Sequence, residues 1–211
     1  MNREKRFVFW IIASIFLITV GFFAASYWVN KWKENHPLSM PSAQIVRLDK
    51  GNYKVGEKIK NGFYDIKVKG TVQFLSRRLS NGDQLLGIEL YKNNQVIVSG
   101  SGSVSLYPAA FNKLKKNSRG EYVIVHSGFY IAGKQLPPGK YTLHCSTKKK
   151  EKKQVDILVQ ILPSFNENST LSKSIKLSDT LSFVINKGNI LQIDKALFDE
   201  SNNVDILLTK T

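Results

Sequence analysis

The segment YKVGEKIKNGFYDI at residues 53–66 returns without a gap as YIAGKQLPPGKYTL at residues 130–143, at a constant offset of 77. Both copies carry a tyrosine, a glycine three residues later, and then a second glycine and a second tyrosine at matched places. The glycines suit tight turns that need positive φ, and the tyrosines suit a pleated sheet. The duplication therefore predicts two copies of one small β fold.

Apolar and polar residues alternate around this segment, which is the pattern of a half-buried β-strand. In residues 64–69 the apolar side chains take the even positions and the charged ones the odd positions. We expect further strands at residues 141–146 and 155–162. Turn-forming sequences lie between such runs, at Asn81-Gly82-Asp83, Asn93-Asn94, Pro137-Pro138-Gly139 and Lys187-Gly188-Asn189. The predicted fold class is mainly β, a twofold-repeated antiparallel β-sandwich-like domain behind an N-terminal transmembrane helix.

A second correspondence extends the repeat toward the C-terminus at an offset of 87. It matches Leu90, Val96, Val98, Val104, Leu106 and Ala109 with Leu177, Phe183, Ile185, Leu191, Ile193 and Ala196. This offset implies about ten additional residues in the second copy. We therefore expect repeat 1 at residues 46–118 and repeat 2 at residues 119–211.

The repeated segment resembles the Y-x-V-G-x-D-I-P-x-G-x-Y motif of small exported β-domains on surface proteins and lipoproteins of low-GC Gram-positive bacteria. The first copy keeps Tyr53, Val55, Gly56, Ile59, Gly62 and Tyr64, with Lys58 and Lys60 where Asp and Pro are usual, and the second keeps Tyr130, Gly133, Pro137, Gly139 and Tyr141. The resemblance implies a small β fold and an exported location. It implies no site, because these domains carry no defined activity.

An uncharged stretch of 23 residues, 7–29, precedes the repeats and as an α-helix would span roughly 35 Å. Thirteen of its residues are Leu, Ile, Val or Phe, and tryptophans lie near both ends. We predict a cytoplasmic tail at 1–6, a transmembrane helix (a signal-anchor) at 7–29 and a stalk at 30–45. The alternative is a signal peptide with its cleavage site at Ala24-Ala25-Ser26.

Lysines and arginines lie on both sides of this stretch, so the positive-inside rule barely decides the orientation. The tail before the stretch is short and basic, which favours a cytoplasmic N-terminus. The predicted location is the cell membrane, with a single pass and an extracytoplasmic C-terminal domain.

The formal net charge is +15, from 31 Lys and Arg against 16 Asp and Glu, and +13 of it lies beyond residue 6. Such a surface attracts polyanions, so the expected partner is an anionic cell-wall polymer or an envelope protein. Cys145, the single cysteine, excludes an internal disulfide, and one cysteine with three histidines argues against a structural zinc site. We predict no metal, no cofactor and no catalytic residue.

Two basic groups are the candidate polyanion-binding residues. They are Lys113, Lys115, Lys116 and Arg119 in the connection between the repeats, and Lys148, Lys149, Lys150, Lys152 and Lys153 in the expected hairpin tip between residues 141–146 and 155–162. The alternative for the second group is a solvated loop that protects a sheet edge.

Two rival functions remain. Tyr141-Thr142-Leu143-His144-Cys145 resembles superficially the end of the catalytic strand in sortase-like cysteine transpeptidases. Alternation in a strand places His144 and Cys145 on opposite faces, and no arginine follows Arg119, where a sortase-like enzyme would carry one shortly after its cysteine. Offset 77 also makes Cys145 the equivalent of the apolar Val68, so a buried position is expected. The other rival is a cytoplasm-facing domain that recruits nucleic acid, which lacks the expected aromatic–basic interleaving.

Overall fold

The computed structural model describes residues 43–147, 156–165, 167–195 and 203–211, together with Thr19 and Gly21. Met40–Thr211 form one compact unit, the β unit. The predicted tail, nearly all of the predicted membrane helix and most of the stalk lie outside the described residues, as does the lysine group from Lys148 to Lys153. Within the described ranges, no helix combines the length and apolarity that a membrane crossing requires.

The prediction of a mainly β fold is confirmed, since all the regular structure described in the β unit is strand. The strands are β1 (Val46–Leu48), β2 (Gly51–Lys54), β3 (Gly62–Phe74), β4 (Arg77–Leu79), β5 (Gln84–Leu90), β6 (Gln95–Pro108), β7 (Tyr122–Ile124), β8 (Ser127–Ile131), β9 (Gly139–Thr147), β10 (Ile157–Leu162), β11 (Leu171–Ile175), β12 (Thr180–Ile185), β13 (Ile190–Asp194) and β14 (Val204–Lys210).

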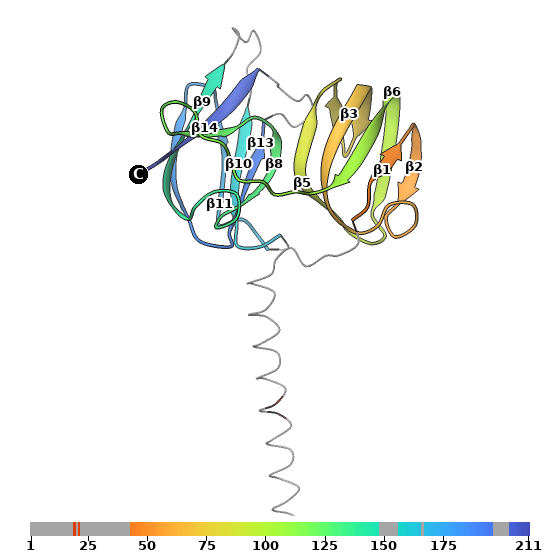
Figure 1. Cartoon of the computed structure of the whole chain (residues 1–211), viewed down its shortest axis with the longest axis horizontal. Coiled ribbons are helices and arrows are strands. Elements are labelled where there is room, and N and C mark those ends of the chain that lie inside the picture. Colours follow the sequence, from red (N-terminus) through yellow and green to blue (C-terminus); the bar gives the residue numbers. More distant parts are fainter. Residues whose placement is uncertain (1–18, 20, 22–42, 148–155, 166, 196–202) are drawn as a thin grey trace, which may run out of the picture. The chain divides into compact units, whose positions relative to one another are not determined.

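The strands form two open sheets in a sandwich-like arrangement (Figure 1). The larger sheet has the order β1-β6-β3-β5-β8-β13-β10-β11, with β2 paired to β6 and β4 paired to β3. The smaller sheet has the order β12-β9-β14-β7. Strands β1 to β6 belong to the first repeat and β7 to β14 to the second, so the larger sheet runs through both repeats.

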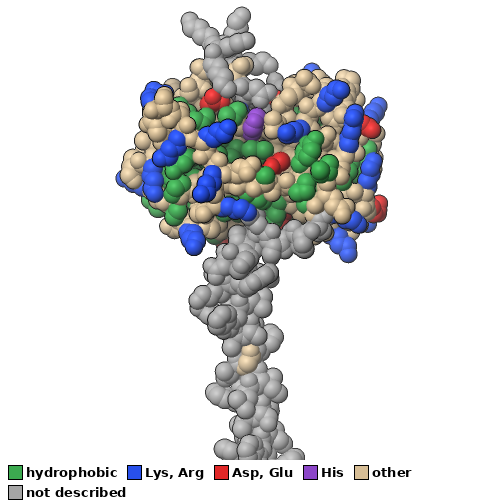
Figure 2. All heavy atoms as spheres, in the orientation of Figure 1, with side chains coloured by type: hydrophobic (Ala, Val, Ile, Leu, Met, Phe, Trp, Pro, Cys, Tyr) green, Lys and Arg blue, Asp and Glu red, His purple; other side chains and the backbone are tan. Residues whose placement is uncertain are grey.

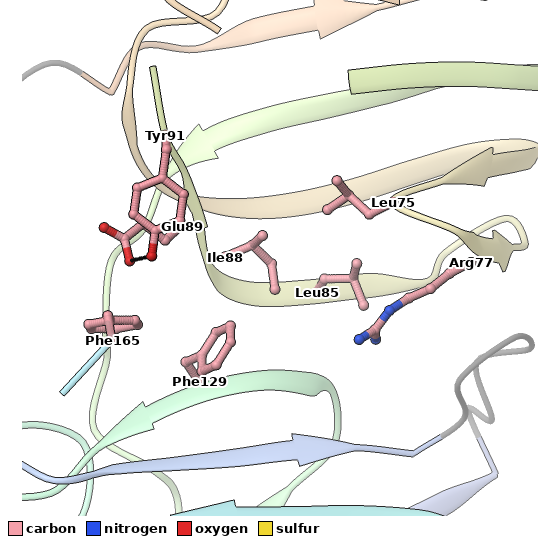
Figure 3. A pocket seen from close by; sticks show the side chains of 8 residues that line it. All are labelled: Leu75, Arg77, Leu85, Ile88, Glu89, Tyr91, Phe129 and Phe165. Carbon is pink, nitrogen blue, oxygen red and sulfur yellow. Dashed lines mark hydrogen bonds between the residues drawn. The ribbon is translucent and has the colours of Figure 1, made fainter. Parts of the chain in front are cut away.

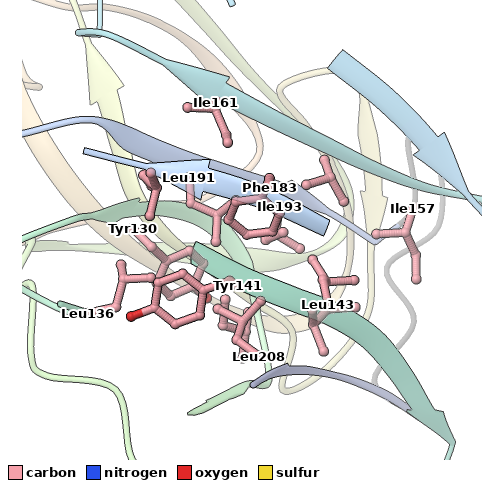
Figure 4. Close-up of a cluster of buried hydrophobic side chains, with 14 of the residues drawn as sticks. Tyr130, Leu136, Tyr141, Leu143, Ile157, Ile161, Phe183, Leu191, Ile193 and Leu208 are labelled. Carbon is pink, nitrogen blue, oxygen red and sulfur yellow. The ribbon is translucent and has the colours of Figure 1, made fainter. Parts of the chain in front are cut away.

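Each repeat has its own hydrophobic core. The first cluster contains residues between Leu48 and Leu106, and the second contains residues between Ile124 and Leu208. Figure 4 shows the second cluster, in which the rings of Tyr141 and Phe183 stack with centroids 6.1 Å apart. Period-two alternation builds both clusters, because one face of each strand is apolar.

Four tyrosine hydroxyls repeat one contact at the predicted offset of 77. Each donates to the backbone carbonyl oxygen four residues earlier, which fixes the chain where it enters a strand. The bonds are Tyr53 to Asp49 (2.9 Å), Tyr64 to Lys60 (2.7 Å), Tyr130 to His126 (2.5 Å) and Tyr141 to Pro137 (2.7 Å).

The expected offset of 87 in the second half of the repeat is wrong, and the structural offset is 95. Gly62 pairs with Leu90 in the first repeat, and its equivalent Gly139 pairs with Ile185 in the second. The two offsets differ by eight, and an even shift along a strand leaves every side chain on the same face. Apolar alternation therefore matches at both offsets, whereas the hydrogen-bonded register distinguishes them. The second repeat is 18 residues longer at this point rather than ten.

Strand β3 is continuous in the first repeat, but its equivalent in the second repeat is divided into β9 and β10. These two strands lie in different sheets and do not pair with each other. The expectation that residues 141–146 and 155–162 flank a hairpin tip is therefore wrong, because the connection between them links two sheets. In the first repeat the chain turns the same corner without a break at Gly70, which pairs with Gly102 of β6.

One pair of strands departs from the predicted antiparallel arrangement. Strands β5 and β8 pair in parallel, through Leu85 with Ser127 and Leu86 with Gly128, and this ladder joins the two repeats. A Cβ at Gly128 would lie 2.2 Å from the Leu86 carbonyl oxygen, so the close approach requires glycine. Parallel pairing needs a long connection between the strands, which here contains β6 and β7.

Candidate functional site

The solvent-facing side of the first repeat's sheet carries a cluster that we call the basic face: Arg47 on β1, Lys67 and Lys69 on β3, and Tyr107 on β6. All four side chains are exposed. They occupy this side because the alternating residues of β3, such as Ile66, enter the first core. The basic face is therefore the polar half of the pattern that builds the fold.

The strand register determines the spacing of these cations. Arg47 of β1 and Lys67 of β3 both pair with Ser105 of β6, so Ser105 lies between them. With neighbouring strands about 4.8 Å apart, the backbones at Arg47 and Lys67 are roughly 10 Å apart, and those at Lys67 and Lys69 about 7 Å apart. The result is a regular two-dimensional array of positive charges with a hydroxyl at its centre.

An aromatic ring belongs to this array. The Lys67 Nζ atom lies 5.4 Å from the centroid of the Tyr107 ring, which is within cation–π range. The Tyr107 side chain is 37% exposed. An incoming ligand therefore meets a planar ring on β6 and ammonium groups on the neighbouring strand β3.

Two carboxylates lie near the basic face, and neither forms an ion pair with its lysines. Asp65 accepts hydrogen bonds from the backbone amides of Gly87 (3.0 Å) and Ala110 (3.1 Å). Arg47 pairs with Asp49 at 3.7 Å, but both side chains are well exposed, so this pair contributes less than about 1 kcal/mol. Within the described residues neither lysine of the basic face forms an ion pair. Figure 2 shows Lys and Arg outnumbering Asp and Glu on the visible face of the β unit.

The second repeat provides an internal comparison, because the equivalent positions carry different chemistry. Val123, Leu207 and His144 stand where the first repeat has Arg47, Ser105 and Lys67. His144 Nε2 lies 3.6 Å from Glu121 Oε1. The shared fold therefore does not require the basic face, which belongs to the first repeat alone.

The predicted basic residues in the connection between the repeats do not belong to the basic face. Lys113, Lys115, Lys116 and Arg119 are all exposed between β6 and β7. This connection runs along the second repeat, where the Val123 amide donates to the Lys115 carbonyl oxygen at 3.0 Å. The Lys116 Nζ atom lies 4.7 Å from the Tyr122 ring centroid, and Arg119 Nε lies 3.2 Å from Glu121 Oε2. This basic group therefore lies along the second repeat, whereas the basic face lies on the first.

Cys145 has the strand position that the repeat predicts, but its side chain is half-buried rather than buried. It pairs with Ile206 and packs against the second core, as its equivalent Val68 pairs with Val104. Burial, and to a lesser degree the charge of Asp179, raises the pKa of the Cys145 thiol to about 11. Because His144 makes its contact with Glu121, the two neighbours do not form a nucleophile–base pair. No group of three or more potential metal ligands occurs in the described part of the chain.

A shallow pocket of about 260 Å³ lies where the repeats meet (Figure 3). At one end Tyr91 donates its hydroxyl to Glu89 Oε2 at 2.6 Å, and burial raises the pKa of both groups. Phe165 packs against Phe129 with ring centroids 5.5 Å apart. At the other end Arg77 is held by an ion pair with Asp194, so the pocket's polar groups are used within the chain.

No protein-family model, curated protein or solved structure matches this chain. The comparison between its own two repeats therefore distinguishes the residues that both copies of the fold share from the basic residues that only the first copy carries.

Proposed function

We propose that this chain is a non-catalytic, membrane-anchored protein of the cell envelope whose extracytoplasmic β unit binds an anionic wall polymer through the basic face. Residues 7–29 serve as the single-pass anchor in this proposal. The observation that carries it is the array of Arg47, Lys67, Lys69 and Tyr107, whose two lysines form no ion pair with any described residue and which the second repeat lacks.

The physical basis is multivalent electrostatic attraction. Cationic side chains whose backbones are about 7 to 10 Å apart can each meet one negative group of a repeating polymer. Each contact on an exposed surface is weak, but several contacts on one polymer act together. The overall charge of +13 beyond residue 6 adds a long-range attraction that raises the rate of encounter.

The test is sedimentation of the full chain, kept in a mild detergent, with isolated anionic wall polymer and with an uncharged polysaccharide. We expect binding to the anionic polymer alone, with a steep loss between low and moderate salt. Lys67→Glu with Lys69→Glu is expected to weaken binding by about tenfold or more. The matched control is Lys173→Glu with Lys176→Glu, which makes the same charge change on exposed lysines of the second repeat and is expected to cost less than about threefold.

Equal losses in the two double variants would show that net charge alone attracts the polymer and would remove the basic face as the site. Absence of binding at low salt would refute the polymer and leave an envelope protein as the partner. Protease treatment of intact cells tests the orientation separately, since an extracytoplasmic β unit is cleaved and a cytoplasmic one is protected.

A further inference from the structure

The two repeats join through a different edge strand of each. Each of these two strands has an equivalent in the other repeat, and neither equivalent takes part in the junction. Strand β5 of the first repeat pairs with β8 of the second. The equivalent of β5 in the second repeat is β12, and the equivalent of β8 in the first repeat is β2. Within the described residues β12 pairs only with β9, and β2 pairs only with β6.

The register shows that these strands are true equivalents. Ile66 of β3 pairs with Leu85 of β5, as Leu143 of β9 pairs with Leu181 of β12. In the same way Tyr53 of β2 pairs with Val96, and Tyr130 of β8 pairs with Leu191. The two open edges therefore follow the pairing of the two joined edges, except that β5 carries a β-bulge at Gly87 (φ +66°) and β12 is regular.

We propose that copies of this chain associate head to tail, with β12 of one copy pairing in parallel with β2 of the next. In the internal ladder Leu85 pairs with Ser127 and Leu86 with Gly128. Replacing each residue by its equivalent predicts that Leu181 of one copy pairs with Lys50 of the next, and Ser182 with Gly51. Such a contact joins two different surfaces, so it propagates into a ring or an open filament rather than closing as a twofold dimer.

A retained glycine supports this pairing. Gly128 must lack a Cβ because one would lie 2.2 Å from the Leu86 carbonyl oxygen across the junction. Among the described residues its equivalent Gly51 has no backbone atom this close, and the nearest atoms to an added Cβ belong to Tyr53, at 3.3 Å or more. The first repeat thus keeps the Cβ-free position that the junction needs, and among the described residues the Tyr53 ring packs against it.

The exposed edge of β12 also lacks the usual protection against pairing. Its sequence, Thr180–Ile185, contains no lysine, no proline and no charge, and Val184 is 59% exposed. Edge strands that remain unpaired commonly carry a lysine, a proline or another charged residue. Beside the internal junction Phe129 packs against Phe165 of its own repeat, whereas Asn52 stands at the equivalent place on β2. We therefore expect the contact between copies to be weaker than the internal one and to depend on concentration.

The experiment is disulfide cross-linking of the full chain in mild detergent, in a Cys145→Ala background. Mixing a Lys50→Cys variant with a Leu181→Cys variant is expected to give a covalent dimer, and the double variant is expected to give a ladder of higher multimers. The control replaces Leu181→Cys by Ser172→Cys, which lies exposed on β11, an edge strand that has no equivalent role. It is expected to give little product with Lys50→Cys.

A second measurement uses Gly51→Ala, whose methyl group requires only a small shift of the Tyr53 ring within the chain, whereas the proposed contact leaves no space for it. We expect an unchanged unfolding transition and at least a tenfold loss of cross-linked product. Cross-linking that Gly51→Ala leaves unchanged would overturn the proposal. Efficient dimers of Leu181→Cys with itself would also overturn it, because they indicate twofold pairing of two β12 edges.

Discussion

Arg77 of the first repeat donates from Nη2 to Asp194 Oδ2 of the second repeat at 2.6 Å. The Arg77 side chain is 20% exposed and that of Asp194 is 4% exposed. This charge-assisted bond connects β4 to β13 beside the β5–β8 ladder, so it fastens the two cores to each other.

Replacing this arginine is expected to destabilise the junction. Arg77→Leu removes a charge-assisted hydrogen bond to a buried carboxylate, and we expect a loss of about 2 to 3 kcal/mol in the free energy of unfolding, measured with urea. Arg78→Leu is the matched control, because Arg78 is the next residue of β4 and is exposed. Its effect should stay within about 0.5 kcal/mol, and equal effects would contradict a special role for Arg77.

The tyrosine contacts are expected to contribute equally in the two repeats. Tyr64→Phe and Tyr141→Phe each remove one hydroxyl that donates at 2.7 Å and keep the buried ring. We expect each to cost about 1 kcal/mol in urea unfolding. The double variant should cost the sum, because the sites lie in separate cores. A cost confined to one repeat would show that the contacts are equivalent in geometry only.

The corner of β3 is expected to be intolerant of any side chain. A Cβ at Gly70 would lie 2.3 Å from the Ser101 carbonyl oxygen, and the residue has a φ of +82°. Gly70→Ala is therefore expected to cost more than about 3 kcal/mol. Gly82→Ala is the control, because its φ of +90° imposes similar strain with no atom within 4 Å, and about 1 kcal/mol is expected. Thermal unfolding of both variants measures the difference.

The Cys145 thiol is expected to be unreactive in the folded chain. With its pKa raised to about 11, little thiolate is present at pH 8. We expect iodoacetamide to modify it at least about 100-fold more slowly in the native chain than in urea. A Ser146→Cys variant in a Cys145→Ala background places an exposed thiol one residue away and should react rapidly. Rapid native modification of Cys145 would revive the transpeptidase hypothesis.

Acid is expected to remove a contribution that Glu121 makes to stability. The Asn117 amide, 2.8 Å away, holds the pKa of the Glu121 carboxyl below its ordinary value, with help from Arg119 and His144. Because the folded-state pKa is lowered, this stability is present above the ordinary pKa of about 4.3 and is lost as the pH falls through the lowered value. The unfolding difference between the wild type and Glu121→Gln should therefore shrink on acidification. A constant difference would contradict the ionic origin.

Much of the fold could be predicted from short-range patterns. Alternation in residues 64–69 predicted a strand with one buried face, and β3 has it. The turn sequences at residues 81–83 and 187–189 lie between strands as expected. These features depend on neighbours only a few residues apart, which the sequence displays directly.

Pairing over long distances could not be predicted in the same way. The offset of 87 failed because a period of two accepts any even shift. The separation of β9 from β10 follows from a corner that the first repeat turns at Gly70 without interruption, and no local signal marks it. The parallel β5–β8 ladder depends on how the repeats meet, which alternation does not encode.

The basic face escaped the sequence analysis for a similar reason. Arg47, Lys67 and Tyr107 come from three strands and become neighbours only through the register with β6. Sequence analysis instead selected continuous runs of lysine and arginine, such as the connection that holds Lys115 and Lys116. A count of exposed cations along each strand would have found the candidates, but their convergence required the register.

The longer second repeat shows where this architecture tolerates foreign sequence. Its additional residues lie between β9 and β10, between β10 and β11, and between β13 and β14. The connection between β10 and β11 corresponds in the first repeat to the two-residue turn Leu75-Ser76, which joins β3 to β4. The second repeat already has a longer connection at this place, so a reporter or epitope inserted into the Leu75-Ser76 turn is expected to leave both cores folded.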